Sequence, residues 1–200
     1  MVVLFAEDFP SESTRLRRAA SGAIVPIVRG VWTDQVGTAL EEVVAEHWRQ
    51  IVAHIFPGAV ITGRTGFEHA PESGNLFIAH SRWRPLILPG LAIHPDGDDD
   101  YRRGDDIVIL EGRLFGASTV RALIDNAETR GRPSDPPRRL SREELEMRVA
   151  TIITTATTAE LEALAAAVAA ETNTVSAALI TELIHRETGA LGLFTLPEIT

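Results

Sequence analysis

The sequence of 200 residues contains no cysteine and no lysine. Without cysteine there is no disulfide, no thiol nucleophile and no cysteine-ligated zinc or iron–sulfur site. Without lysine there is no Schiff-base chemistry and no phosphate-binding loop that depends on a lysine. All 19 basic residues are arginine, whose planar guanidinium suits forked contacts to phosphate, guanine or carboxylate.

Long apolar segments are also lacking, because no run of 18 apolar residues occurs. The N-terminus has no charged region followed by an apolar stretch and a cleavage site. From these two absences we expect a cytoplasmic protein with no membrane partner. The hydrophobic content of 44% is enough for one or two domains, each with a buried core.

The formal charge of −9 argues against a nucleic-acid binder taken as a whole, because counterion release requires a basic face. The acidic residues are unevenly distributed, however. Residues 140 to 200 hold nine acidic residues and three arginines, whereas residues 1 to 35 hold four of each. The N-terminal third can therefore present a local basic patch.

Residues 13 to 33 predict a short helix followed by a β-hairpin. The helix has an N-cap candidate in Ser13 or Thr14, Leu16 is its expected apolar anchor, and a Ser-Gly pair ends it. β-branched and aromatic residues on both sides of the following Arg-Gly pair predict two strands. Pro26 removes a ladder donor from the first of these strands and confines it to an edge.

A helix followed by a hairpin is how a winged helix ends. In that arrangement the helix faces a major groove, and the hairpin tip lies along the backbone or in the adjoining minor groove. The residues expected to contact double-stranded DNA are three on the helix and one at the hairpin tip: Arg15, Arg17, Arg18 and Arg29. The alternative for these four arginines is a solvated helix face and a turn.

Residues 39 to 56 carry apolar side chains three and four positions apart, which predicts a connecting helix of about five turns. His47 and His54 lie roughly on one face of it but have no acidic partner in zinc-motif order, so we expect no metal ligand there. Short β-branched runs over residues 59 to 94 then predict a small sheet. Four residues at the ends of these runs are candidates for a surface that binds a partner or phosphate: Arg64, Arg82, Trp83 and Arg84. The alternative is that they are ordinary solvent-exposed residues.

The second half of the chain predicts more strand, then helices. The aspartate-rich residues 95 to 106 lack the ligand order of a calcium loop and are interpreted as a solvated turn. A helix with an apolar stripe is expected at 119 to 127 after a cap at Ser118 or Thr119. Residues 128 to 139 are rich in proline, glycine and charge, which is typical of a linker.

Beyond that linker, Ser141 and Glu144 form a capping box before one or two alanine- and leucine-rich helices, interrupted near Thr172-Asn173-Thr174. The predicted organisation is a winged-helix-like segment, an α/β domain with the long helix and small sheet, and a helical segment: residues 1–36, 37–130 and 140–200.

Motifs for catalysis are missing. No glycine-rich phosphate loop, no G-x-S-x-G elbow and no H-E-x-x-H motif occurs. Glu143 and Glu144 lie in the first turn of a predicted helix, where the helix dipole explains them. We therefore expect a protein that is not an enzyme and has no cofactor.

Several segments resemble one known family. The pattern LRRAASGAIVPIVRGVWT resembles the N-terminal winged-helix region of AbiEi-type antitoxins, and FPGAVITGRTGFEH and GRLFGASTVRALIDNA resemble later segments of that group. Over residues 13 to 185 the chain is also closely similar to the N-terminal, antitoxin-like part of certain bacterial Fic-family proteins. HWRQIVAHIFPGAVITGRT, LPGLAIHP and LSREELEMR find counterparts there in the same order.

The antitoxin resemblance implies a transcription regulator of a toxin–antitoxin system. Such antitoxins repress their own promoter and are paired with a nucleotidyltransferase toxin, and Arg15, Arg17, Arg18 and Arg29 would be the DNA contacts. The Fic signature H-P-F-x-x-G-N-G-R is missing from the chain. The alternative function is therefore a regulatory module of a Fic-type nucleotidyl (AMP) transferase that lacks the catalytic domain and acts by protein contact.

The fold expected from these observations is α+β, with an abbreviated winged helix, a long connecting helix, a small mixed β-sheet domain and a helical C-terminal segment. The expected partners are the protein's own promoter DNA, a cognate toxin and a second copy of the chain. A homodimer would supply two half-sites, and the C-terminal helices are the expected place for it.

Overall fold

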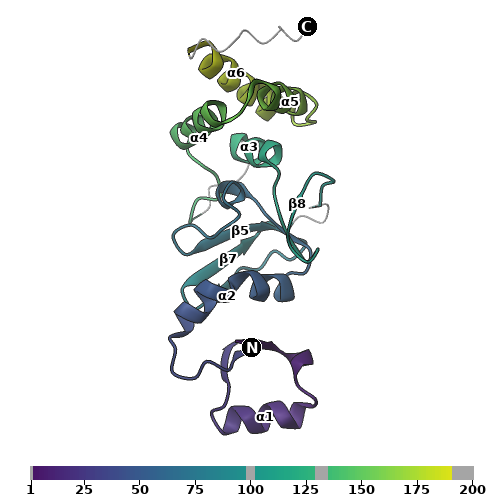
Figure 1. The fold of residues 1–200 in the computed structure, drawn as a ribbon, viewed down its shortest axis with the longest axis vertical. Coiled ribbons are helices and arrows are strands. Elements are labelled where there is room, and N and C mark those ends of the chain that lie inside the picture. Colours follow the sequence, from purple (N-terminus) through teal and green to yellow (C-terminus); the bar gives the residue numbers. More distant parts are fainter. Residues whose placement is uncertain (1, 98–101, 129–134, 191–200) are drawn as a thin grey trace. The chain divides into compact units, whose positions relative to one another are not determined.

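The computed structural model describes residues 2–97, 102–128 and 135–190 (Figure 1). The chain divides into two compact units. We call Met1–Ile61 with His69–Gly116 the sheet unit, and Thr62–Glu68 with Ala117–Thr200 the helical unit. Together they contain a three-stranded antiparallel sheet, a six-stranded mixed sheet and α-helices, which confirms the predicted α+β class.

The sheet unit begins with a small antiparallel sheet in the order β1-β3-β2. Helix α1 follows β1 and leads into the β2–β3 hairpin, so the predicted helix and hairpin are confirmed. Strand β2, which holds Pro26, lies at an edge as predicted. These elements are β1 (Val3–Phe5), the short 3-10 helix η1 (Ala6–Asp8), α1 (Glu12–Ala20), β2 (Val25–Val28) and β3 (Val31–Thr33).

Two details of α1 differ from the prediction. The N-cap is Ser11, whose hydroxyl accepts a hydrogen bond from the backbone N–H of Thr14 at 3.2 Å, so the helix begins two or three residues earlier than expected. Leu16 is not the apolar anchor, because its side chain is 54% exposed. The correction has a physical cause: the aromatic residues on which α1 packs approach the face that carries Ala19.

The six-stranded sheet has the order β6-β7-β5-β4-β9-β8. The β5–β7 and β4–β9 pairs are parallel and the others antiparallel, as a mixed sheet requires. Its bounds, after the long helix α2 (Leu40–Ile55), are β4 (Ala59–Ile61), β5 (Asn75–Ala79), β6 (Leu86–Leu88), β7 (Leu91–Pro95), β8 (Ile107–Leu110) and β9 (Leu114–Gly116).

Helix α2 covers one face of this sheet (Figure 1). Ile51 and Val52 on the helix and Ile61 and Ile78 on the sheet are fully buried in one apolar cluster. Burial of about 25 cal/mol for each Å² of apolar surface makes this cluster the main stabilising contact of the unit. The predicted connecting helix is thus confirmed within one residue at each end.

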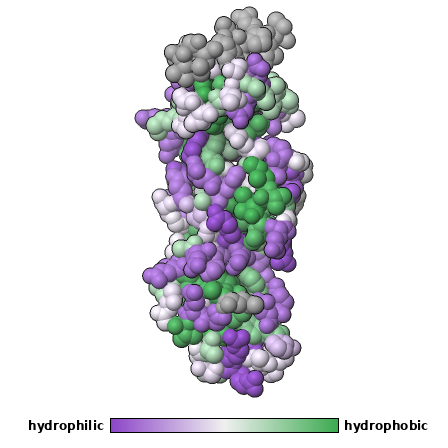
Figure 2. Space-filling view, in the orientation of Figure 1, coloured by the Kyte–Doolittle hydropathy of each residue, from purple (hydrophilic) through white to green (hydrophobic). Residues whose placement is uncertain are grey.

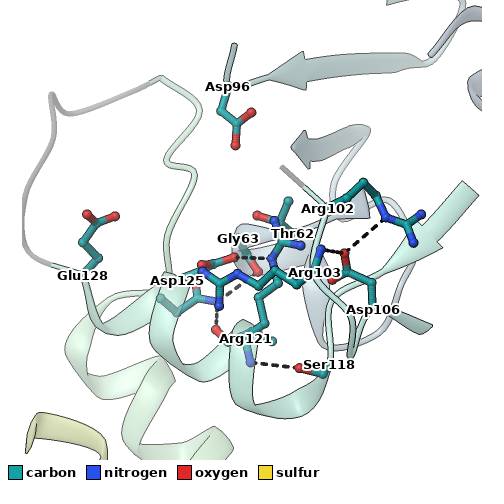
Figure 3. A network of polar contacts seen from close by, with 12 residues as sticks. Thr62, Gly63, Asp96, Arg102, Arg103, Asp106, Ser118, Arg121, Asp125 and Glu128 are labelled. Carbon is teal, nitrogen blue, oxygen red and sulfur yellow. Dashed lines mark hydrogen bonds and ion pairs between the residues drawn. The ribbon is translucent and has the colours of Figure 1, made fainter. Parts of the chain in front are cut away.

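The helical unit packs four helices around a second apolar cluster. Its elements are η2 (Gly63–Gly66), α3 (Thr119–Ala127), α4 (Arg142–Thr155), α5 (Thr158–Ala169) and α6 (Thr174–Ala190). The predicted capping box is present, since Ser141 and Glu144 exchange hydrogen bonds at 2.6 and 3.2 Å. Ser118 caps α3 by accepting from the backbone N–H of Arg121 at 3.2 Å (Figure 3).

The division of the chain differs from the segments expected from the sequence. Helix α3 was expected with the sheet in residues 37–130, but its Leu123 and Ile124 are buried in the same cluster as Leu145 of α4 and Ile180 of α6. The predicted linker at 128–139 falls partly on residues 129–134, outside the described residues. The segment 62–68, far away in sequence, also belongs to the helical unit.

Candidate nucleic-acid interface

Helix α1 is held to the small sheet by aromatic residues. None of its own residues is fully buried. Beneath it, Leu4, Phe9, Ile24 and Trp32 form a buried apolar cluster against which Ala19 packs. The Phe9 and Trp32 rings meet edge to face with their centroids 5.6 Å apart, an arrangement that aromatic pairs favour.

Two of the predicted DNA-contacting arginines cover this cluster. The guanidinium carbon of Arg15 lies 4.7 Å from the ring centroid of Trp32, and that of Arg18 lies 5.7 Å from the centroid of Phe9. Arg15 also forms an ion pair with Glu12 at 3.2 Å. Cation–π contacts at partly exposed sites contribute about 0.5–1 kcal/mol each, so Arg15 and Arg18 help to fix α1 on the sheet.

The other two arginines point to solvent. Arg17 lies on the exposed side of α1, and Arg29 lies at the tip of the β2–β3 hairpin. The tip is a two-residue turn in which Gly30 has φ +89°, a conformation that glycine adopts without strain. Within the part of the chain that the structure describes, neither Arg17 nor Arg29 makes an ion pair.

Two acidic side chains near the N-terminus have partners of their own. Asp8 accepts a hydrogen bond from the backbone N–H of Phe5 at 2.8 Å, and Glu7 lies 3.3 Å from His54 on α2. His54 also stacks on the Phe5 ring at 4.0 Å, which gives this histidine a packing role. Arg17 and Arg29 are therefore the side chains best placed to meet phosphate from this segment.

The predicted partner-binding residues separate into two groups. Arg82, Trp83 and Arg84 are exposed and lie together in the loop before the edge strand β6. Arg64 lies in the helical unit, where its guanidinium pairs with Glu144 at 3.1 Å. The β-branched run that suggested a strand end at Arg64 stops at Ile61, and η2 follows.

The loop of Arg82 is anchored by a buried histidine. Nδ1 of His80 accepts the backbone N–H of Arg82 at 3.0 Å, and Asp96 accepts the backbone N–H of His80 at 3.1 Å. Burial, followed by the nearby positive charge of Arg82, lowers the pKa of His80 below its ordinary value of 6.5, although Pro57 and Asp96 act in the opposite direction. The neutral imidazole is therefore the form that holds this loop.

Acidification should destabilise the sheet unit through His80. Because its pKa is lower in the folded state than the 6.5 of the unfolded chain, the stability it contributes is present above pH 6.5 and is lost as the pH falls through the folded pKa. The free energy of unfolding should be measured with urea at several pH values between 7.5 and 5. Its slope against pH should be smaller in His80→Gln than in the wild-type protein, by the equivalent of up to one proton. Equal slopes in both proteins would contradict this role.

Sequence reasoning missed the aromatic support under α1. Trp32 was used only as strand-forming material, and Val3–Phe5 was not recognised as a strand because it is a single short apolar run. In the described residues no group of three or more His, Asp or Glu side chains is arranged to hold a metal ion. None of the described helices is long and apolar enough to cross a membrane.

We compared the chain with known protein families, proteins and structures. No protein-family model, no curated protein and no solved structure matches the chain. The resemblance to AbiEi-type antitoxins and to the N-terminal part of Fic-family proteins thus stays a prediction.

Proposed function

We propose that the chain is a non-enzymatic, DNA-binding transcription regulator of the AbiEi antitoxin type. Helix α1 and the β2–β3 hairpin form the contact surface, with Arg17 on the helix and Arg29 at the hairpin tip as the phosphate or base contacts. Arg15 and Arg18 position the helix through the rings of Trp32 and Phe9. The cognate toxin and a second copy of the chain are the further partners that this function implies.

One observation carries the proposal. A Ser-capped helix leads directly into a hairpin of a three-stranded sheet, and each of these two elements presents an exposed arginine. Phosphate contacts orient such a unit on the duplex, while side chains that reach base edges supply specificity. The acidic character of the whole chain does not prevent this, because Glu7, Asp8 and Glu12 of the same segment are held by other partners.

The test is the binding of the DNA upstream of the protein's own gene, measured by fluorescence anisotropy at several salt concentrations. Each phosphate contact contributes about 0.9 to the slope of log K against log salt. The double variant Arg17→Ala, Arg29→Ala should therefore bind more weakly, with a slope smaller by about 2.

The matched control is Arg113→Ala, which removes an equally exposed arginine from the β8–β9 turn. It should leave both the affinity and the slope unchanged. A flat titration of the original chain up to about 100 μM, far above the tight end of non-specific binding, would exclude the DNA function. Equal losses in the control and the double variant would exclude this surface.

A second candidate function is a regulatory module of a Fic-type transferase that acts by protein contact alone. The observation in its favour is the presence of large exposed apolar side chains away from α1, including Trp83 and Ile87 in the sheet unit. On the face shown in Figure 2, apolar surface is gathered in a few patches on a largely hydrophilic surface. This function predicts no DNA binding at any salt concentration, so the same titration separates the two.

A further inference from the structure

The two most exposed large apolar side chains of the described residues are four positions apart in the segment that forms one edge of the six-stranded sheet. Ile87 is 70% exposed and Trp83 is 67% exposed. Both belong to the segment that forms β6 and the loop before it. Scattered single apolar residues are ordinary on a protein surface, but a pair at a strand edge is typical of an interaction site.

Strand β6 is an edge strand. It pairs with β7 on one side, and no other described strand pairs with it. Leu88 is buried against the α2 side of the sheet, so Ile87, one position earlier, faces the opposite way. An edge strand presents a row of backbone donors and acceptors to which an extended segment can add as a further strand.

The same edge carries positive charge in a chain that is otherwise acidic. Residues 73 to 95 contain no aspartate or glutamate, and their arginines are Arg82 and Arg84. Both arginines are exposed. The formal charge of the whole chain is −9, so the two arginines give this segment the opposite sign to the chain as a whole and favour a negatively charged partner.

The basic and apolar groups are held in place before any partner arrives. Arg82 donates from its guanidinium to the backbone C=O of Ile55 at 2.7 Å and lies over the Phe56 ring at 5.7 Å. The Arg84 guanidinium lies 5.2 Å from the ring centroid of Trp83.

The backbone of Gly97 lies close to the Cβ of Trp83. Gly97 has φ +76°, and a Cβ atom built on it would lie 2.8 Å from the Cβ of Trp83. Side chains ordered in advance lose less conformational entropy on binding. The contact with Gly97 and the hydrogen bond from the backbone N–H of Arg82 to His80 therefore hold the loop in place before a partner binds.

We propose that the β6 edge binds an extended acidic segment of a partner protein, which adds as a strand beside β6. Carboxylates of the segment pair with Arg82 and Arg84, and its apolar side chains pack on Trp83 and Ile87. This surface shares no residue with α1 and the hairpin, so it goes beyond the proposed DNA function. It also excludes Arg64 from the partner-binding set expected from the sequence.

A single-stranded nucleic acid is the competing class of ligand for a surface with arginine and tryptophan. The structure favours a peptide, because an extended peptide can pair with the backbone edge of β6, to which no described strand pairs on that side, and can pack an apolar side chain on the exposed Ile87.

The experiment uses the full chain and a fluorescent ten-residue peptide with glutamate at alternate positions and valine or threonine between them. Two reference peptides accompany it: one with lysine in place of glutamate, and one with the same sequence as the first but N-methylated at alternate residues to block strand pairing. We expect the glutamate peptide to bind about tenfold more tightly than either reference, a difference of about 1.4 kcal/mol.

The variants locate the binding on this edge. Arg84→Glu, which removes a guanidinium that lies on Trp83 and leaves Arg82 opposed by one carboxylate, should abolish the preference for the glutamate peptide over the lysine peptide. Trp83→Ala should weaken binding of the glutamate peptide about tenfold. Arg17→Glu with Arg29→Glu is the control, since it changes the DNA surface and should leave peptide binding unchanged. Circular dichroism of each variant verifies that it is folded.

Three results would overturn the proposal. The first is that the glutamate peptide does not bind at concentrations up to about 1 mM, which corresponds to a binding free energy of about −4 kcal/mol. The second is that the three peptides bind equally well. The third is that an oligothymidine strand binds more tightly than the glutamate peptide and that Arg84→Glu abolishes its binding. The last result would assign the edge to single-stranded nucleic acid. None of these outcomes depends on whether the DNA titration succeeds.

Discussion

Replacing Trp32 by alanine should release α1 from the small sheet and abolish the DNA binding proposed for it. Trp32 is 9% exposed, meets Phe9 edge to face, and supports the guanidinium of Arg15. Because no residue of α1 is itself fully buried, these contacts are what hold the helix in place. Truncating a buried aromatic residue costs about 3–5 kcal/mol, which is enough to detach a helix that has no buried residue of its own.

Hydrogen exchange measures this effect where it occurs. The amides of α1 should lose protection in Trp32→Ala, while the amides of β5 in the larger sheet should keep theirs. The matched control is Leu16→Ala, because Leu16 lies on the exposed side of the same helix. It should change stability by less than about 0.5 kcal/mol. A larger loss in Leu16→Ala than in Trp32→Ala would show that α1 packs in the manner first expected from the sequence.

Replacing Asn126 by alanine should destabilise the helical unit strongly. The side chain is 4% exposed, and its amide connects three parts of this unit. Its nitrogen donates to the C=O of Gly63 at 2.9 Å and of Ala122 at 2.8 Å, and its oxygen accepts the N–H of Leu140 at 2.9 Å. Without the amide these groups lose a partner in a buried place, and such a loss costs about 1–3 kcal/mol for each unsatisfied group.

We therefore expect a loss of about 3 kcal/mol in the free energy of unfolding of the helical unit, measured by urea denaturation. Asn126→Asp should be nearly as harmful, because a carboxylate accepts from Leu140 but does not donate to Gly63. Gln50→Ala is the control, since it removes an exposed amide from α2. An Asn126→Ala protein as stable as Gln50→Ala would show that the connection contributes nothing.

Much of the secondary structure was predictable because its signals are local. The capping box at Ser141, the two-residue turn at Gly30 and the proline at position 26 each restrict the backbone of only a few residues, and the structure contains all three features. The apolar stripe of α2 is equally local, because helical spacing places its members on one face whatever they pack against.

The assignment of side chains to surfaces was less predictable. The spacing of Arg15, Arg17 and Arg18 shows that they share a helix. It does not show which of them lie over aromatic rings, one of which comes from β3 and the other from the segment before α1. Leu16 was misplaced for the same reason. Arg64 was grouped with Arg82 because both follow β-branched runs, although Arg64 is paired with Glu144, 80 residues away in sequence.

The sequence by itself determined the α+β class, the helix and hairpin near the N-terminus, the long helix and the capped helices near the C-terminus, because turn chemistry, capping and periodicity act over short stretches of chain. Only the tertiary structure decided that α3 packs with α4 and α6, that Asn126 joins three segments, and that Trp83 and Ile87 lie exposed on a free strand edge. These outcomes depend on which distant residues meet, and local sequence does not encode the identity of a distant partner.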